Sequence, residues 1–150
     1  VGGRFDTLQA AILLEKMKYF KKEILMRKSK FLYYSKMIEI INVSLKENKQ
    51  IRIIKSQSNQ SCYASFNLVL PCDSRNKLIK FLNSKKINSA IYYPRTIVDN
   101  APYKKFGSNK SLKISNFLKK NILALPFDPY IKKKHIKFIC LQIKNFYKKN

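Results

Sequence analysis

The sequence is poor in acidic residues, histidine and glycine. Only 8 Asp and Glu stand against 32 Lys and Arg, so the formal net charge is +24 over 150 residues. The single histidine, His135, argues against a histidine-based metal site and against a Ser-His-Asp triad. The three cysteines, Cys62, Cys72 and Cys140, are odd in number and lack C-x-x-C spacing. They indicate neither a disulfide framework nor a zinc site, so we expect a protein of the reducing cytoplasm.

Long apolar runs are also absent. No stretch approaches the roughly 18 apolar residues that a membrane span needs, and no signal peptide is recognisable. The positive charge would normally indicate nucleic acid or an anionic membrane as the partner. The lysines are scattered through every segment, however, which is more typical of a solvated surface. A basic module that binds nucleic acid or another anionic surface remains the alternative interpretation, although we expect no specific nucleic-acid partner.

The first forty residues predict one long helix. Asp6 occupies the position of an N-cap, with Gln9 as its capping-box partner. Apolar residues then recur at steps of three and four, with one polar interruption at Arg27. We expect a helix over residues 6–41 that packs on a small sheet. The apolar positions of this seam are Leu13, Met17, Phe20, Ile24, Phe31, Tyr34, Ile38 and Ile41.

Short strands and helices alternate in the rest of the chain, which predicts an α+β domain. The β-branched and alternating segments predict an edge strand at 51–54, and strands at 62–70, 87–93 and 122–125. Helical patterns predict a helix from Asp73 or Ser74 to about Ser84, another at 112–120, and a final helix entered near Pro129 whose seam includes Ile136, Ile139, Ile143 and Phe146. Residues 94–107 form a loop longer than a usual connector, which is typical of a functional loop.

Three sequence blocks resemble one protein family. The first is G-G-R-F-D-T-L-Q-A-A-I-L at residues 2–13. It resembles G-x-N-x-R-(M/L)-D-x-L-Q-A-A-I-L, the loop-to-helix segment of the sugar aminotransferases of the DegT/DnrJ/EryC1/StrS family. Residues 92–103, Y-Y-P-R-T-I-V-D-N-A-P-Y, resemble the family's Y-Y-P-x-P-L-H-x-Q-P-A-Y, and residues 123–130, L-A-L-P-F-D-P-Y, resemble its L-S-L-P-M-H-P-Y. The blocks occur in the family's order and cover nearly the whole chain.

The resemblance implies a fold and an activity. Residues 1–150 are expected to be the C-terminal small domain of a fold-type I aminotransferase that depends on pyridoxal phosphate. Such enzymes hold the cofactor on a lysine of their N-terminal domain, which has no counterpart here, so we expect the chain to be inactive alone. The full enzyme is expected to be a homodimer that moves an amino group from glutamate to a keto sugar nucleotide. The first block is most similar to members acting on UDP-linked 3-keto-glucuronates in surface polysaccharide synthesis. A remnant without activity is a further interpretation.

The first block also implies contacts with the cofactor and the substrate. In the family this loop reaches across the dimer interface toward the cofactor of the partner subunit. Gly2 takes the place of the asparagine that contacts pyridoxal phosphate, so Gly2 and Gly3 are expected to contribute backbone N–H groups. Arg4 matches the family's arginine and is expected to bind a carboxylate or phosphate of the substrate. A salt bridge at the surface or at an interface is the alternative role for Arg4.

The second block departs from the family at two positions. The histidine that approaches the sugar is replaced by Val98, which neither donates, accepts nor titrates, and the second proline is replaced by Thr96. The resemblance therefore leaves Tyr93 and Asn100 as expected substrate contacts, with ordinary packing as the alternative for the tyrosines. A further departure is Lys86, which stands at a family glycine after a helix, where the left-handed conformation would cost lysine about 1 kcal/mol.

Overall fold

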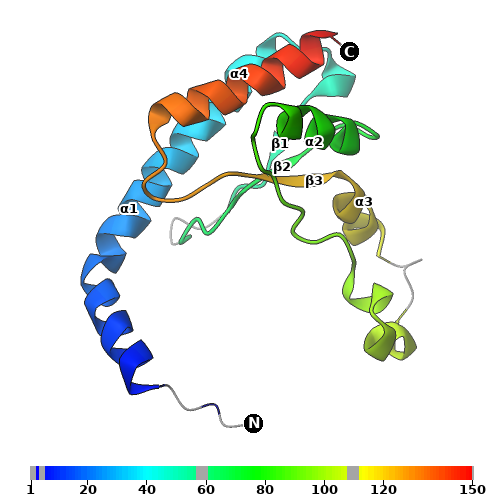
Figure 1. Ribbon diagram of the computed structural model, residues 1–150. Helices are drawn as coiled ribbons and strands as arrows, with labels where there is room; N and C mark the ends of the chain where they lie inside the picture. Colours follow the sequence, from blue (N-terminus) through cyan, green and yellow to red (C-terminus); the bar gives the residue numbers. More distant parts are fainter. Residues whose placement is uncertain (1–2, 4–5, 57–60, 108–111, 150) are drawn as a thin grey trace.

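The computed structural model describes residues 3, 6–56, 61–107 and 112–149, and it confirms a mixed architecture of helices and a small sheet (Figure 1). A long bent helix comes first, and the short strands and remaining helices follow. The elements in chain order are α1 (Thr7–Val43), η1 (Glu47–Lys49), β1 (Arg52–Ile53), β2 (Phe66–Val69), α2 (Arg75–Ser84), η2 (Ile97–Asp99), η3 (Ala101–Phe106), α3 (Lys113–Asn121), β3 (Ile122–Leu125) and α4 (Lys133–Lys149).

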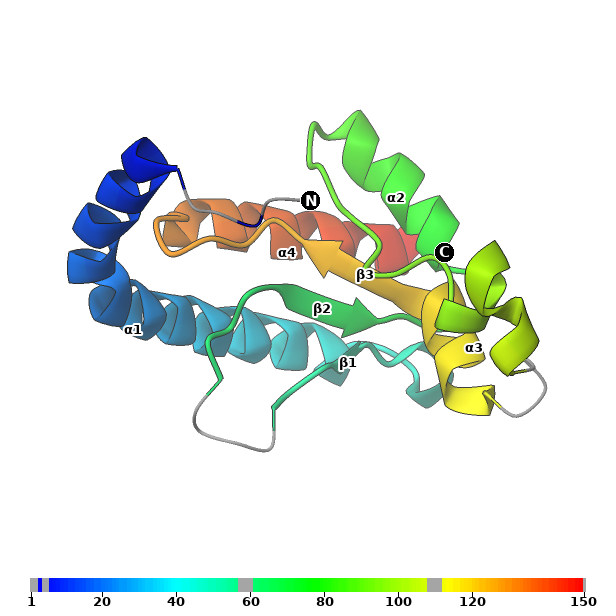
Figure 2. The ribbon, with the colours of Figure 1, turned by 90° about the horizontal axis from the view of Figure 1, so that it is seen from below.

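The three strands form one antiparallel sheet in the order β1-β2-β3. The predicted edge strand is therefore confirmed at β1, and the strand predicted at 122–125 is confirmed as β3. Phe66 pairs with Leu125 and Val69 with Ile122. Helices α1 and α4 lie side by side across one face of the sheet (Figures 1 and 2), and the apolar core fills the space between them and the strands.

The C-terminal half of α1 supplies the buried part of the predicted seam. The ring of Tyr34 stacks on the ring of Phe66, with 4.5 Å between centroids. The Tyr34 hydroxyl donates a hydrogen bond to the backbone oxygen of Pro126 at 3.0 Å. Arg27, the polar interruption of the seam, directs its guanidinium to the backbone oxygen of Ala64 at 3.4 Å. The buried seam residues are Phe31, Tyr34, Ile38 and Ile41.

The end of α1 is tied to the edge strand by Asn42. Its Nδ2 donates to the backbone oxygen of Ile51 at 2.8 Å, and its Oδ1 accepts from the backbone N–H of Ile51 at 2.9 Å. The side chain thus takes the place of a neighbouring strand. Because Ile51 is buried, these two bonds satisfy peptide groups that water does not reach.

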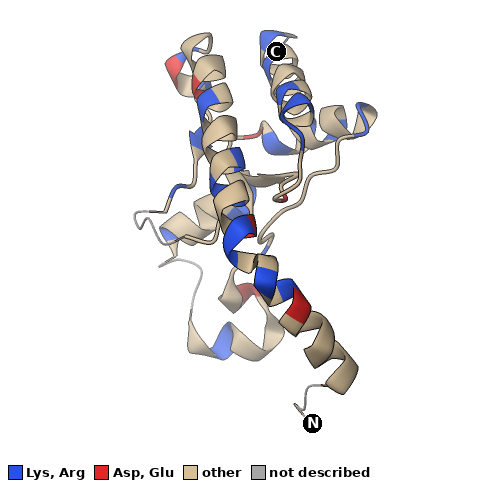
Figure 3. Ribbon diagram, turned by 90° about the vertical axis from the view of Figure 1, so that its left-hand side faces the viewer, with Lys and Arg blue, Asp and Glu red and all other residues tan. Residues whose placement is uncertain are grey.

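The N-terminal half of α1 is apolar and exposed. On the predicted seam, Leu13, Met17 and Phe20 have exposed fractions of 43%, 63% and 50%. Figure 3 shows the first turns of α1 without a charged residue, and the first one along the helix is Glu15. A helix that is apolar on several sides is typical of a buried position. Further exposed apolar residues in this half are Leu8, Ile12, Leu14, Tyr19 and Leu25.

Within the described ranges, none of the helices has the combination of length and apolar character required to cross a membrane. This holds for α1 as well, since charged residues recur along it from Glu15 onward.

Asp6 is the N-cap of α1, as predicted. Its Oδ1 accepts a hydrogen bond from the backbone N–H of Leu8 at 3.0 Å. The Asp6 side chain thus caps the helix through Leu8 and not through the predicted partner Gln9. One N-terminal amide of the helix is satisfied by this contact.

Two predicted strands differ from the structure. The strand predicted at 62–70 is confined to β2, because Tyr63 has φ 48° and leaves the extended conformation. The strand predicted at 87–93 is wrong. Only Ala90 pairs, in an isolated bridge to Ala124. The backbone N–H of Ile87 donates to the oxygen of Leu82 at the end of α2. The segment therefore bonds to β3 only through the pair Ala90 and Ala124 among the described residues.

The final helix begins later than predicted. It starts at Lys133 and not near Pro129. The carboxylate of Asp128 accepts from the backbone N–H of Tyr130 at 2.7 Å, which forms a turn ahead of the helix. The predicted seam of this helix is confirmed, since Ile136, Ile139, Ile143 and Phe146 are all buried.

Helix α2 ends in a left-handed turn at Lys86, which has φ 57°. The backbone N–H of Lys86 bonds to the oxygen of Asn83, and the N–H of Ile87 bonds to the oxygen of Leu82. This pair of bonds is a Schellman motif, in which glycine is the preferred residue at the left-handed position.

We expect Lys86→Gly to stabilise the chain by about 1 kcal/mol, because glycine adopts this conformation without the steric cost that Lys carries. Denaturant unfolding should give a higher midpoint with an unchanged slope. Lys85→Gly is the matched control, since Lys85 has φ −98° and gains nothing from the exchange. A midpoint raised equally by both variants would contradict this explanation.

Cys140 should be the protected thiol of the chain. Its side chain is 1% exposed and burial raises its pKa to about 12, whereas Cys62 and Cys72 are exposed. Because the thiolate is the reactive form, a disulfide reagent near pH ~8 should modify two thiols rapidly and the third only in denaturant. Three rapidly reacting thiols in the native chain would contradict the packing of α4.

The apolar half of α1 should make the isolated chain associate with itself, since large exposed apolar patches favour association. Light scattering should show a mass that rises with concentration, and the double variant Leu13→Gln, Met17→Gln should lower it. Leu141→Gln is the control, because Leu141 is an exposed leucine on α4. Equal masses at all concentrations for the unmodified chain would show that this surface does not drive association.

Candidate functional site

The loop predicted at 94–107 is folded into two short 3₁₀ helices, η2 and η3, beside α3. It follows the bridge residue Ala90 and the tyrosine pair. Tyr92 and Tyr93 have ring centroids 5.9 Å apart, and the peptide bond between them is cis. This loop carries the residues that the second sequence block singled out.

The loop is anchored by the carboxylate of Asp99. Thr96 donates to Asp99 Oδ2 twice, from its backbone N–H at 2.7 Å and from its hydroxyl at 2.9 Å. Lys119 of α3 donates to the same oxygen at 2.8 Å in a partly buried ion pair. The first two bonds are part of a capping box for η2. This network was not among the predictions from sequence, although the spacing Thr-x-x-Asp is its signal.

Tyr93 and Asn100 occupy different positions in this loop. Tyr93 has an exposed fraction of 75%. Asn100 donates from Nδ2 to the backbone oxygens of Thr96 and Ile97 at 3.2 and 3.3 Å, so its amide group stabilises the turn. Their assignment as substrate contacts stays a prediction.

Val98, at the family's histidine position, is half-buried against Gly107. A Cβ atom added to Gly107 would lie 3.2 Å from Val98 Cγ1, which leaves little room for a larger residue. Val98 therefore serves the packing of the loop on itself.

The first block lies mostly outside the described residues. Gly2 and Arg4 are not described, whereas Gly3 is exposed and a Cβ atom added to it would meet no atom within 4 Å. The start of α1 and the loop with Tyr93 lie on opposite sides of the molecule (Figures 1 and 2). Among the described residues, the start of α1 is therefore remote from the loop with Tyr93.

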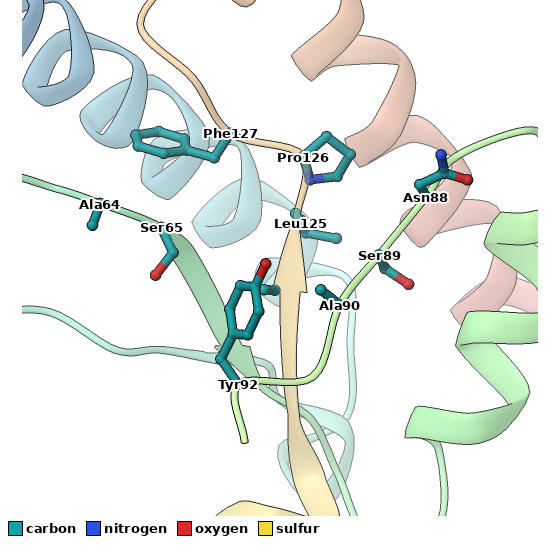
Figure 4. A pocket seen from close by; sticks show the side chains of 10 residues that line it. Ala64, Ser65, Asn88, Ser89, Ala90, Tyr92, Leu125, Pro126 and Phe127 are labelled. Atoms are coloured by element: carbon teal, nitrogen blue, oxygen red, sulfur yellow. The ribbon is translucent and has the colours of Figure 1, made fainter. Parts of the chain in front are cut away.

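A hollow of about 280 Å³ opens on the sheet edge near the bridge (Figure 4). Ser65, Ser89, Tyr92 and Phe127 are among its lining residues. Ser89 Oγ is buried without a hydrogen-bond partner among the described residues. This hollow was not predicted from the sequence, because its small polar residues follow no helical or strand periodicity.

No lysine among the described residues is buried. The buried polar residues among them are Ser35, Thr96 and Asn121, so none is a lysine. A lysine that captures pyridoxal phosphate needs a desolvated pocket to be unprotonated. The described part of the chain also contains no cluster of His, Cys, Asp and Glu suited to a metal ion.

Comparisons with known proteins agree with the resemblance. The chain is 28% identical over 145 residues to a UDP-2-acetamido-2-deoxy-3-oxo-D-glucuronate aminotransferase of Pseudomonas aeruginosa, covering 97% of this chain and 37% of that protein. A DegT DnrJ EryC1 StrS aminotransferase from Brucella abortus has a similar structure, with a TM-score of 0.82, 26% identity, and coverage of 96% of this chain and 36% of the other.

Helicobacter pylori PseC, an aminotransferase of pseudoaminic acid biosynthesis, has the same fold. Its TM-score is 0.80 at 14% identity, over 98% of this chain and 38% of that chain. The chain thus spans little more than a third of the length of these relatives. The sequence profile of the DegT/DnrJ/EryC1/StrS aminotransferase family matches residues 1–144, and the chain belongs to that family.

Proposed function

We propose that this chain is the C-terminal portion of a sugar-nucleotide aminotransferase that depends on pyridoxal phosphate. The enzyme would move an amino group from glutamate to a keto sugar nucleotide in the synthesis of a surface polysaccharide. The observation that carries the proposal is the family match over residues 1–144, joined to a relative whose name specifies a UDP-linked keto-glucuronate. We assign the fold to the small domain of fold-type I aminotransferases, with residues 1–150 as one domain.

The chain would supply the substrate side of the site. In this proposal Arg4 binds an anionic group of the sugar nucleotide, and the backbone N–H groups of Gly2 and Gly3 face the cofactor. Tyr93 and Asn100 lie on a loop that the Asp99 and Lys119 ion pair holds against α3. The lysine that carries the cofactor would belong to the part of the relatives' length that this chain does not span.

The complete enzyme would be a homodimer in the cytoplasm. A dimer is favoured because the start of α1 and the Tyr93 loop lie far apart within one copy. The free thiols of Cys62, Cys72 and Cys140 suit a reducing compartment.

Charge does not favour a nucleic-acid module. Figure 3 shows Lys and Arg spread over α1, α4 and other elements, whereas nucleic-acid binders cluster them on one face. A specific binder would show saturable, steeply salt-dependent affinity for one nucleic acid.

Incubation with pyridoxal phosphate tests the proposal directly. We expect the isolated chain to show no stoichiometric adduct on a single lysine after borohydride reduction, because none of its described lysines is buried, whereas covalent capture of the cofactor needs a lysine in a desolvated pocket. Mass spectrometry of tryptic peptides should show only low, scattered modification. A single fully modified lysine with glutamate-dependent turnover would show that this chain holds a complete site, and would overturn the assignment.

A further inference from the structure

A further hollow, of about 440 Å³, opens beside the last turns of α4, close to the point marked C in Figure 1. Its other walls come from η1, from α2 and from the segment between β2 and α2. Small-molecule sites have volumes of about 300–1,000 Å³, so this hollow is large enough for a ligand. None of the site residues predicted from the sequence lines it. Its lining includes Lys49, Cys72, Asp73, Lys77, Phe146 and Tyr147.

The floor of this hollow is aromatic. Phe146 and Tyr147 are buried, and their rings meet at 83° with 5.1 Å between centroids. The Ser74 hydroxyl donates to the backbone oxygen of Pro71 at 2.7 Å, so Tyr147 is the donor in the 3.3 Å contact between its own hydroxyl and that of Ser74. Burial raises the pKa of Tyr147, which keeps this donor protonated. Because the proton of Tyr147 is already used, the floor offers ring surface to a ligand, and ring surface favours an aromatic group.

The rim of the hollow carries more positive than negative charge. Lys49 and Lys77 line it together with Asp73, so two ammonium groups stand against one carboxylate. Lys77 and Asp73 are exposed, and neither belongs to an ion pair among the described residues. An ammonium group attracts an anion as a point charge. A ligand that rests on the floor would therefore gain from an anionic group at the rim.

We propose that this hollow binds a small aromatic anion, with its ring on Phe146 and Tyr147 and its carboxylate or other anionic group beside Lys49 and Lys77. Both features have to be present in one ligand. A neutral aromatic molecule leaves the ammonium groups at the rim unused, and an inorganic anion leaves the aromatic floor uncovered. The site goes beyond the proposed function and does not depend on it, because it uses none of the residues of that proposal.

Cys72 provides a reporter for this site, because its exposed thiol lines the hollow, whereas the exposed Cys62 does not line it. The test uses the 150-residue chain in two forms, Cys62→Ser and Cys72→Ser, each of which keeps one exposed thiol. Dithiodipyridine is the neutral thiol reagent, and 2-naphthoate is the aromatic anion. Because the rate of disulfide exchange depends on access to the thiol, 2-naphthoate should slow Cys72 saturably, by about fivefold or more, and change the rate of Cys62 less than about 1.3-fold.

Variants of the rim charges separate recognition from adsorption. In the Cys62→Ser chain, Lys77→Gln should raise the half-saturating concentration of 2-naphthoate about threefold and Asp73→Asn should lower it about twofold, since exposed charges interact modestly across water. Asn tolerates the φ of 61° that Asp73 adopts. Lys134→Gln is the matched control and should change the value less than about 1.3-fold. This exposed lysine lies about 20 Å along α4 from Tyr147, beyond the screening length of about 8 Å.

Matched ligands test the two parts of the site. 2-Naphthamide lacks the charge and hexanoate lacks the ring, so each should need a concentration at least about fivefold higher for the same protection of Cys72. Equal protection by either ligand, equal slowing of Cys62 and Cys72, or an unchanged half-saturation in Lys77→Gln would each overturn the site. The assay contains neither pyridoxal phosphate nor a sugar nucleotide, so its outcome is independent of the borohydride test of the proposed function.

Discussion

The packing of α1 on the sheet through Tyr34 is the contact on which the remaining geometry depends. The Tyr34 ring stacks on Phe66 of β2, and its hydroxyl bonds to the Pro126 oxygen just after β3. Burial raises the pKa of the Tyr34 hydroxyl, so it remains a neutral donor to that carbonyl. The Tyr34 side chain thereby holds α1 against β2 and against the residues that follow β3. The Pro126 and Phe127 wall of the hollow in Figure 4 owes its place to this contact.

Charge contributes little to holding this fold together. The pairs Lys18 with Glu15 and Lys55 with Glu39 are largely exposed, and such pairs contribute between about 0 and 1 kcal/mol. The partly buried pair of Lys119 with Asp99 holds a loop and not the core. With few acidic residues to pair with, most cations face solvent, and the apolar core carries the stability. Because the positive charges are spread over the solvated surface, the basic composition by itself does not identify a binding partner.

Periodicity predicted the elements that bury a regular face. The helices α1 and α2 were located within a few residues because their apolar residues recur at helical spacing, and β3 because it is a short apolar run; α3 was also located within a few residues. The two wrong strand predictions occurred where the conformation of a single residue ends the extended chain. Tyr63 has a positive φ ahead of β2, and the backbone N–H of Ile87 bonds to the end of α2 and not to a strand. Sequence pattern predicted a long loop at 94–107, and the structure has the short helices η2 and η3 there. The pattern could not foresee that Asn100 bonds to its own turn or that Val98 packs on Gly107, since both depend on contacts across the loop.

The length of α1 constrains how any complete site can be assembled. At 1.5 Å per residue, a helix of 37 residues extends about 55 Å, less any shortening from its bend. The loop with Tyr93 lies on the other side of the sheet from the start of this helix (Figures 1 and 2). Rotation of a side chain cannot close such a separation. In the proposed homodimer, the start of α1 from one copy and the loop with Tyr93 from the other copy would serve one substrate. The apolar turns around Leu13 and Met17 are then suited to being covered in that assembly, because a helix that is apolar on several sides is stable only when it is enclosed.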